Sequence, residues 1–168
     1  MKKISLKDYY IEHETFPVSK EYYETADFIY DEPSDTSCFC NRIVVNKAAE
    51  NKKILIYDDY YNEKETRIIF EDKFIYYLCG LGKIIKLNLE TLKIEQEIEL
   101  EQFGTYFDLY LKYNRLVISG ELNVYVLDLD FNIIDHLSAP DVLLEFEIND
   151  KIITVKDFNG EYYNLMIK

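Results

Sequence analysis

The chain has 168 residues, of which 48% are hydrophobic and 30% are charged, a balance typical of one folded domain with a buried core. Thirty-two acidic residues against nineteen basic residues give a net charge of −13. Such a field repels the phosphate backbone, so direct nucleic-acid binding is not expected. No apolar run reaches the ~18 residues of a membrane-spanning helix, and no apolar segment follows the basic start. The sequence therefore predicts a cytoplasmic protein that does not bind membranes.

Residues 1–37 differ in composition from the rest of the chain. They carry nine acidic and four basic residues, together with several tyrosines and two prolines. Residues 5–8 are suited to cap a short helix, residues 19–24 to open another, and residues 31–37 have the composition of a loop. We therefore predict that residues 1–37 form a short irregular or helical arm packed on the sheet, and that residues 38–168 form a single all-β domain.

From about residue 41 onward, short runs rich in Ile, Val, Tyr and Phe alternate with turn-like Gly, Asn and Asp residues, as strands do. The runs occupy residues 53–57, 73–79, 83–89, 115–119, 123–128 and 151–155. The sequence GLGK at residues 80–83 lies between two of these runs, so it predicts a tight hairpin turn rather than a phosphate-binding loop. No stretch in this part keeps a helical period. The predicted fold class is all-β.

A weak internal repeat underlies these strands. Its copies begin at Asn41, Asp72, Asn114 and Asp150, so the steps are 31, 42 and 36 residues. Each copy consists of Asn or Asp, a basic residue, an apolar strand, a turn and a second apolar strand. Periods near 40 residues with about four strands each are typical of propeller blades.

The run NVYVLD at residues 123–128 resembles the second-strand motif of quinoprotein-type and other β-propeller repeats, in which an apolar run ends in Asp. The resemblance covers residues 41–168. The chain lacks the Gly-His and Trp-Asp marks of WD40 blades and the Gly that follows the blade Asp in quinoprotein repeats. The resemblance therefore implies antiparallel four-stranded blades, in a small propeller or an open propeller-like arc, and no cofactor. It also implies that a strand from the first forty residues completes the last blade.

Cysteine and histidine residues are few. Cys38 and Cys40 fall two apart, which places them on one face of a strand, but a zinc site needs four ligands and the sequence has no second cysteine pair. We expect buried or reduced thiols here and at Cys79. Neither His13 nor His136 stands near a glycine-rich elbow or an oxyanion-type loop. We therefore predict no catalytic residues, no metal and no enzymatic activity.

An acidic segment follows at residues 94–101. Strand alternation places Ile94, Gln96, Ile98 and Leu100 on one face. The other face carries four carboxylates, those of Glu95, Glu97, Glu99 and Glu101. Two interpretations stay open. The charges protect an outer strand from aggregation, or they form a binding stripe for a basic partner.

A second acidic group combines carboxylates with aromatic rings at a predicted blade turn. It consists of Tyr57, Asp58, Asp59, Tyr60 and Tyr61. Loops between propeller strands are common binding positions, and tyrosines beside carboxylates favour contact with Lys and Arg. Many of the sixteen tyrosines are instead expected to pack in cross-strand pairs.

Small size, strong acidity and the lack of a catalytic constellation suit an inhibitor or adaptor. Sixteen lysines against three arginines predict an AT-rich genome, such as that of a low-GC bacterium. In size and charge the chain resembles immunity proteins, which mask the basic active site of a toxin domain such as a nuclease. The sequence therefore predicts a protein-binding inhibitor with a basic partner. The alternative is a small-ligand or glycan-binding module with an aromatic axial pocket; fold alone does not decide between them.

Overall fold

A computed structural model describes residues 1–168 apart from 19–23, 31–37, 49, 59–66, 81 and 101–103. The described residues form strands joined by turns, and none of them is helical. The strands are β1 (Lys2–Ser5), β2 (Tyr10–Val18), β3 (Phe28–Tyr30), β4 (Cys38–Lys47), β5 (Glu50–Asp58), β6 (Ile68–Glu71), β7 (Phe74–Leu78), β8 (Lys83–Asn88), β9 (Lys93–Glu99), β10 (Tyr106–Lys112), β11 (Arg115–Gly120), β12 (Asn123–Leu127), β13 (Ile133–Ser138), β14 (Leu143–Asn149), β15 (Ile152–Asp157) and β16 (Tyr162–Met166). Within the described part of the chain, no helical segment has the length and apolar character needed to cross a bilayer.

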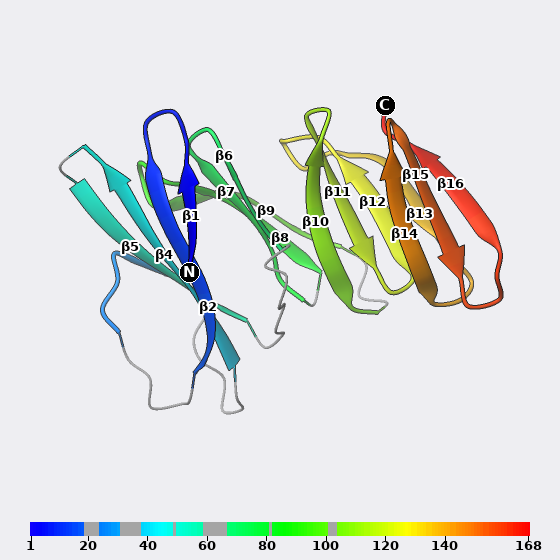
Figure 1. Ribbon diagram of the computed structural model, residues 1–168, viewed down its shortest axis with the longest axis horizontal. Coiled ribbons are helices and arrows are strands. Elements are labelled where there is room, and N and C mark those ends of the chain that lie inside the picture. Colours follow the sequence, from blue (N-terminus) through cyan, green and yellow to red (C-terminus); the bar gives the residue numbers. More distant parts are fainter. Residues whose placement is uncertain (19–23, 31–37, 49, 59–66, 81, 101–103) are drawn as a thin grey trace. The chain divides into compact units, whose positions relative to one another are not determined.

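The strands form four sheets (Figure 1). The first has the order β1-β2-β4-β5-β3, and the others have the orders β6-β7-β8-β9, β10-β11-β12-β13 and β14-β15-β16. In the last three sheets each strand lies beside its neighbour in sequence, as in the up-and-down blades of a propeller. The predicted fold class is confirmed: the described chain is all-β, and three of its sheets are antiparallel and blade-like.

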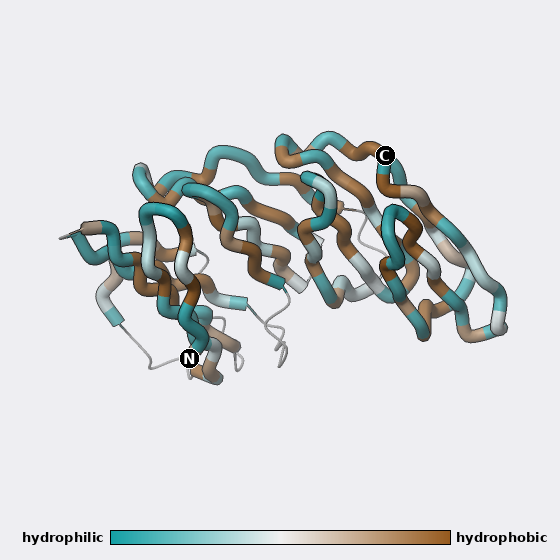
Figure 2. The backbone as a smooth tube through the Cα atoms, turned by 45° about the horizontal axis from the view of Figure 1, so that its top comes forward, coloured by the Kyte–Doolittle hydropathy of each residue, from teal (hydrophilic) through white to brown (hydrophobic). Residues whose placement is uncertain are grey.

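The chain divides into two compact units, which are described separately. One contains Met1–Glu65, Phe70–Ile75 and Leu87–Glu95, and the other contains Thr66–Ile69, Tyr76–Lys86 and Gln96–Lys168. Hydrophobic residues are concentrated along the strands of both units and hydrophilic residues at many of their turns (Figure 2).

The N-terminal segment differs from the predicted irregular or helical arm. Ser5 ends β1 instead of capping a helix, and reciprocal backbone hydrogen bonds between Leu6 and Tyr9 (2.9 and 3.3 Å) close a hairpin to β2. The prediction of a helix at residues 5–8 is wrong because this turn, and the alternating burial of the residues after it, favour a strand. Ile11 and His13 are buried, whereas Tyr10, which precedes Ile11, is exposed. The other predicted helix start was at residues 19–24, of which 19–23 lie outside the described residues. The predicted loop at residues 31–37 also lies outside them.

The N-terminal strands also join a different sheet from the one expected. β2 pairs antiparallel with β4, β1 pairs with β2, and β3 pairs parallel with β5 through Phe28 and Ile54. The prediction that an N-terminal strand completes the last blade is therefore wrong. The long antiparallel β2–β4 register, which runs from Tyr10 to Val18, stabilises the first sheet instead.

The predicted repeats coincide with three hairpins of the structure. Asp72, Asn114 and Asp150 each immediately precede the basic residue at the start of a copy, and their φ angles are 52°, 56° and 51°. Asn and Asp tolerate this left-handed region better than other non-glycine residues because their short polar side chains bond to the local backbone. The repeat is thus the tight turn that leads into the second strand of a blade. Asn41 differs, since it lies inside β4 and pairs with Thr15 of β2.

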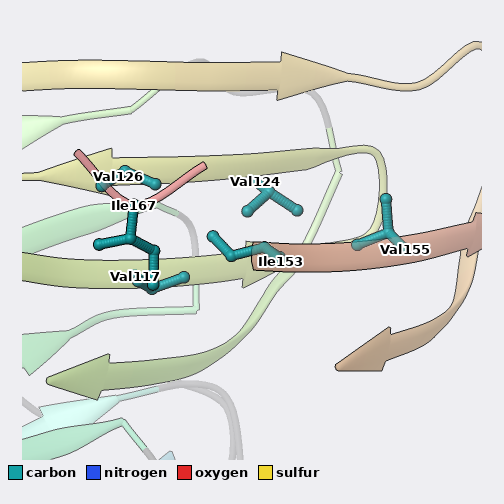
Figure 3. Packing of buried hydrophobic residues seen from close by; sticks show 6 residues of the cluster. All are labelled: Val117, Val124, Val126, Ile153, Val155 and Ile167. Carbon is teal, nitrogen blue, oxygen red and sulfur yellow. The ribbon is translucent and has the colours of Figure 1, made fainter. Parts of the chain in front are cut away.

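A hydrophobic core joins the last two sheets, both of which belong to the second unit (Figure 3). Val117, Val124 and Val126 project from β11 and β12 toward Ile153 and Val155 of β15 (Figure 3). Ile167, which follows β16, packs with them. β-Branched side chains suit such a contact because they are stiff and cover the pleated surface closely. The two sheets therefore pack face to face, as adjacent blades do.

Tyr110 at the edge of this core is expected to make stability fall at alkaline pH. Its ring stacks on Phe146 with centroids 5.4 Å apart, and burial, helped by Asp108, raises the pKa of Tyr110 to about 12 from its usual 10.0. The unfolded chain therefore loses a proton from this residue at a pH where the folded chain retains it, and the stabilising effect is lost as pH rises from 10 toward 12. After allowance for solvent screening we expect a loss of about 1–2 kcal/mol.

Urea unfolding of the wild type and of Tyr110→Phe across this pH range measures the effect as a difference between the two proteins. The variant has no ionisable group at this position, so its stability is expected to fall less steeply. Identical slopes would show that other tyrosines cause the alkaline loss.

Candidate functional site

Strand β9 carries the predicted acidic stripe, and it is the terminal strand of its sheet. A turn held by Asn88 leads into it: the Asn88 side-chain oxygen accepts hydrogen bonds from the backbone N–H groups of Glu90 (2.8 Å) and Thr91 (3.2 Å). Leu92 then adopts a φ of 53° and donates its backbone N–H to the Asn88 carbonyl at 2.9 Å. This turn sets the register of the strand that follows.

The alternation predicted for this strand is present from Glu95 to Leu100, whereas Ile94, expected on the apolar face, is exposed. Glu95, Glu97 and Glu99 are exposed, whereas Gln96 and Ile98 between them are half-buried. The exposed fraction of the Glu99 side chain is 65% and that of Glu97 is 40%. Glu101, the fourth member of the predicted stripe, lies outside the described residues. We refer to Glu95, Glu97 and Glu99 as the β9 stripe.

Polar neighbours on β8 partly compensate the β9 stripe. The Lys83 ammonium lies 3.5 Å from a carboxylate oxygen of Glu97 and 3.9 Å from one of Glu99. The Asn88 side chain donates a hydrogen bond to Glu95 at 2.5 Å. The contacts between Lys83 and these exposed glutamates are weak and screened in water, so they offset only part of the negative charge.

Lys86, further along β8, is directed elsewhere. Its ammonium lies 2.9 Å from the carbonyl oxygen of Leu129 and 3.2 Å from a carboxylate oxygen of Asp130, with Gln96 at 3.4 Å. The Lys86 side chain is only 9% exposed. It therefore connects β8 to the turn after β12, within the second unit, and does not form part of the exposed surface of the β9 stripe.

The second predicted cluster is less accessible. Tyr57 lies near the end of β5 and is buried with Val18, Cys40 and Leu55, against which Phe16 packs. Asp58 is half-buried and pairs in register with Phe39. Asp59, Tyr60 and Tyr61 lie outside the described residues. Of this cluster the structure thus places Tyr57 in a core and Asp58 at the end of a strand.

The cysteine and histidine residues occupy separate structural positions. Cys40 is fully buried in the cluster around Tyr57, and Cys79 is half-buried after β7; the side chain of Cys38 lies outside the described residues. His13 is buried on β2, where its Nε2 atom lies 3.2 Å from the Asn41 side-chain oxygen. His136 is on β13, where it stacks on Tyr125 at 5.8 Å. Across the described ranges, no group of three or more His, Cys, Asp or Glu residues is placed to hold a metal ion.

Gly80, Gly82 and Lys83 of the GLGK run lie at the turn from β7 to β8, whereas Leu81 lies outside the described residues. The Gly82 N–H donates to the carbonyl of Cys79 at 2.9 Å, and the Cys79 N–H donates to the carbonyl of Lys83 at 2.8 Å. Both bonds close a tight reversal between adjacent strands, which is the predicted hairpin.

One acidic and aromatic surface was missed by the sequence analysis. Phe158 begins the turn between β15 and β16 and is 70% exposed. Its backbone N–H donates to the Val142 carbonyl at 2.8 Å, which brings this turn beside the connection from β13 to β14. Asp141 and Glu161 stand on the two connected turns. A large aromatic residue inside the turn sequence DFNGE was the only local signal.

Comparison with known proteins supports the fold and leaves the activity open. The chain matches no protein-family profile and none of the curated proteins. Among solved structures it is similar to the computationally designed Ika4 protein, at a TM-score of 0.53 and 13% identity over 90% of this chain and 96% of that one. It is also similar to the computationally designed Ika8 protein, at a TM-score of 0.52 and 14% identity over 83% of this chain and 45% of that one. A third similar structure is the WD40 β-propeller domain of Doa1, at a TM-score of 0.50 and 12% identity over 76% of this chain and 46% of that one. The chain spans about half the length of the latter two. At these identities the likeness shows a propeller-like fold alone.

Proposed function

We propose that this chain is a protein-binding inhibitor that engages a basic protein partner through the β9 stripe, in the manner of an immunity protein that masks a toxin domain. The observation that supports the proposal is a row of three exposed glutamates on the terminal strand of a sheet. Like charges along one strand repel one another, so this row adds repulsion to the folded chain. They gain favourable energy when a surface rich in Lys and Arg approaches.

The wider charge distribution supports the same mode of binding. Residues 121–168 contain ten acidic residues and three lysines, so the part of the second unit that follows β11 is acidic overall. A field of this sign steers a basic domain toward the chain and raises the association rate, an effect that falls with ionic strength.

Charge reversal on the β9 stripe tests the proposal. Immobilised wild type and the double variant Glu97→Lys/Glu99→Lys are each incubated with lysate of the source organism at about 50 mM and about 500 mM salt, a range over which the screening length shortens markedly. We expect the wild type to capture a basic protein, more strongly at low salt, and the variant to capture at least about tenfold less. With the purified partner, the variant is expected to lose mainly association rate.

The matched control is Glu71→Lys/Glu147→Lys, which changes the net charge equally at exposed glutamates outside the β9 stripe. It is expected to capture the same protein nearly as well as the wild type. Equal capture by all three proteins, or no capture at all, would contradict the proposal. Aggregation of the β9 variant seen by light scattering, with capture unchanged, would identify the glutamates as edge protection only.

A further inference from the structure

A pocket in the first unit lies where three turns meet, well separated in sequence from one another. Its volume is about 480 Å³, within the range of small-molecule sites. Tyr9 comes from the turn between β1 and β2, Lys47 and Glu50 from the β4–β5 hairpin, and Leu89 and Glu90 from the turn after β8. All of these residues belong to the same compact unit.

Three nearly buried side chains form the apolar part of the pocket. Val45 and Leu89 are almost fully buried, and Tyr9 is only 7% exposed. The Lys47 ammonium lies 4.9 Å from the centre of the Tyr9 ring and donates a hydrogen bond to its hydroxyl at 3.3 Å. Burial raises the pKa of Tyr9, so the phenol stays neutral and holds its position. This surface suits a compact ring or short carbon skeleton.

Lysine side chains converge on Glu90 at the polar side of the pocket. Lys47 donates to a Glu90 carboxylate oxygen at 2.7 Å, and Lys52 donates to the Glu90 backbone carbonyl at 2.5 Å. Lys73 approaches the other carboxylate oxygen at 3.9 Å. The hydrogen bond from Lys47 lowers the pKa of Glu90, so Glu90 remains ionised and fixes the ammonium groups near neutral pH.

The positions of these groups are set in advance of any ligand. The backbone N–H of Glu90 donates a hydrogen bond to the side-chain oxygen of Asn88 at 2.8 Å, so the turn that carries Glu90 is anchored to β8. Lys47 and Lys52 come from the paired strands β4 and β5, where Lys52 stands opposite Val45 in the register. Ammonium groups held in this way lose little conformational entropy when an anion binds.

From this geometry we propose that the pocket binds a small hydroxylated carboxylate, such as a sugar acid. The ligand carboxylate bonds to Lys52 and Lys47, its ring lies on Tyr9, Val45 and Leu89, and its hydroxyl groups donate to Glu50 and Glu90. Three lysines around one neutralised glutamate create local positive potential in a chain whose net charge is −13. Because Lys47 is shared with Glu90 and because Glu50 lines the same pocket, the site suits a single negative charge better than a doubly charged phosphate.

The test is an NMR titration of the full chain with three probes that differ at one position: D-glucose, D-glucuronate and D-glucose 6-phosphate. We expect D-glucuronate to shift the backbone amides of Tyr9, Val45 and Leu89 in a saturable way, and the neutral sugar to bind at least about tenfold more weakly. Equal shifts with glucose, or tighter binding of the phosphate, would overturn the assignment to a carboxylate. An absence of saturable shifts with all three probes would overturn the site itself.

Lys52→Met removes one ammonium group while it keeps most of the apolar stem. This variant is expected to bind D-glucuronate about tenfold more weakly, with an unchanged melting temperature. Lys93→Met, at an exposed lysine that does not line the pocket, is the matched control and is expected to bind as the wild type does. If both variants bind equally well, Lys52 does not hold the carboxylate. The outcome is independent of the β9 stripe, so this proposal and the protein-binding proposal can fail separately.

Discussion

Replacing Gly82 by alanine is expected to lower the free energy of unfolding by about 2–5 kcal/mol, because it combines backbone strain with a steric clash. The φ angle of Gly82 is +89°, where a Cβ atom is disfavoured. A Cβ at this position would also stand 2.6 Å from Cε2 of the Tyr106 ring. Tyr106 is 1% exposed, so its ring has little room to move.

Two other glycines separate the contributions of strain and clash. Gly120 faces the opposite edge of the Tyr106 ring, where a Cβ would lie 2.8 Å from Cδ1, and its φ is not positive. Gly160 has a φ of +86° with open space around it. We expect Gly120→Ala to cost about 1–3 kcal/mol from overpacking and Gly160→Ala about 1–2 kcal/mol from strain, as measured by denaturant unfolding. If Gly120→Ala costs nothing, the Tyr106 ring yields easily and the account of Gly82 is wrong.

Replacing Arg67 by methionine is expected to destabilise the second unit by about 2–4 kcal/mol, because it leaves backbone carbonyl groups of another sheet without charged donors. Arg67 is 6% exposed. Its guanidinium group donates to the carbonyls of Tyr106 at 2.7 Å and Phe107 at 3.2 Å. These contacts connect the chain just before β6 to the start of β10. Methionine fills similar volume but donates no hydrogen bond.

The control for this variant is Arg115→Met. Arg115 also donates to backbone carbonyls, those of Lys168 at 2.9 Å and Asn114 at 3.1 Å, but these contacts are exposed to water. We expect the exposed substitution to change stability by less than about 1 kcal/mol, since water replaces the lost donor. Equal losses for the two variants in urea unfolding would show that burial of Arg67 does not add to its contribution.

Local turn chemistry explains how far the sequence predicts the fold. Asp72, Asn114 and Asp150 mark hairpins whose strands pair with their immediate neighbours, so a repeat of turn and strand was visible in the chain. The N-terminal strands β1, β2 and β3 of the first sheet had no comparable signal. His13 and Asn41 meet across β2 and β4 although 28 residues separate them, and the acidic, tyrosine-rich composition between them favoured an arm over a strand.

The candidate sites differ in the same way. The β9 stripe could be predicted from the sequence, because glutamates at alternate positions of one strand must share a face. The pocket lined by Tyr9, Lys47 and Glu90 could not be predicted from the sequence, because Lys47 is 38 residues from Tyr9 and 43 residues from Glu90. Only the meeting of three turns makes these side chains neighbours. Tyr57 shows the opposite error, since a tyrosine beside aspartates suggested a surface while its ring packs against Leu55.

The parallel strand β3 affects the order in which the chain assembles. Phe28–Tyr30 leaves the ribosome before β4 and β5, yet its hydrogen-bonding partner is Ile54 and the residues that follow it. Its place in the sheet exists only after β5 lies beside β4. The hairpins at Asp72, Asn114 and Asp150 need no such wait and form on the microsecond scale typical of short turns, about 1–10 μs. During synthesis β3 is therefore expected to stay unpaired until β5 has followed it, and in that interval its edge is exposed to mispairing.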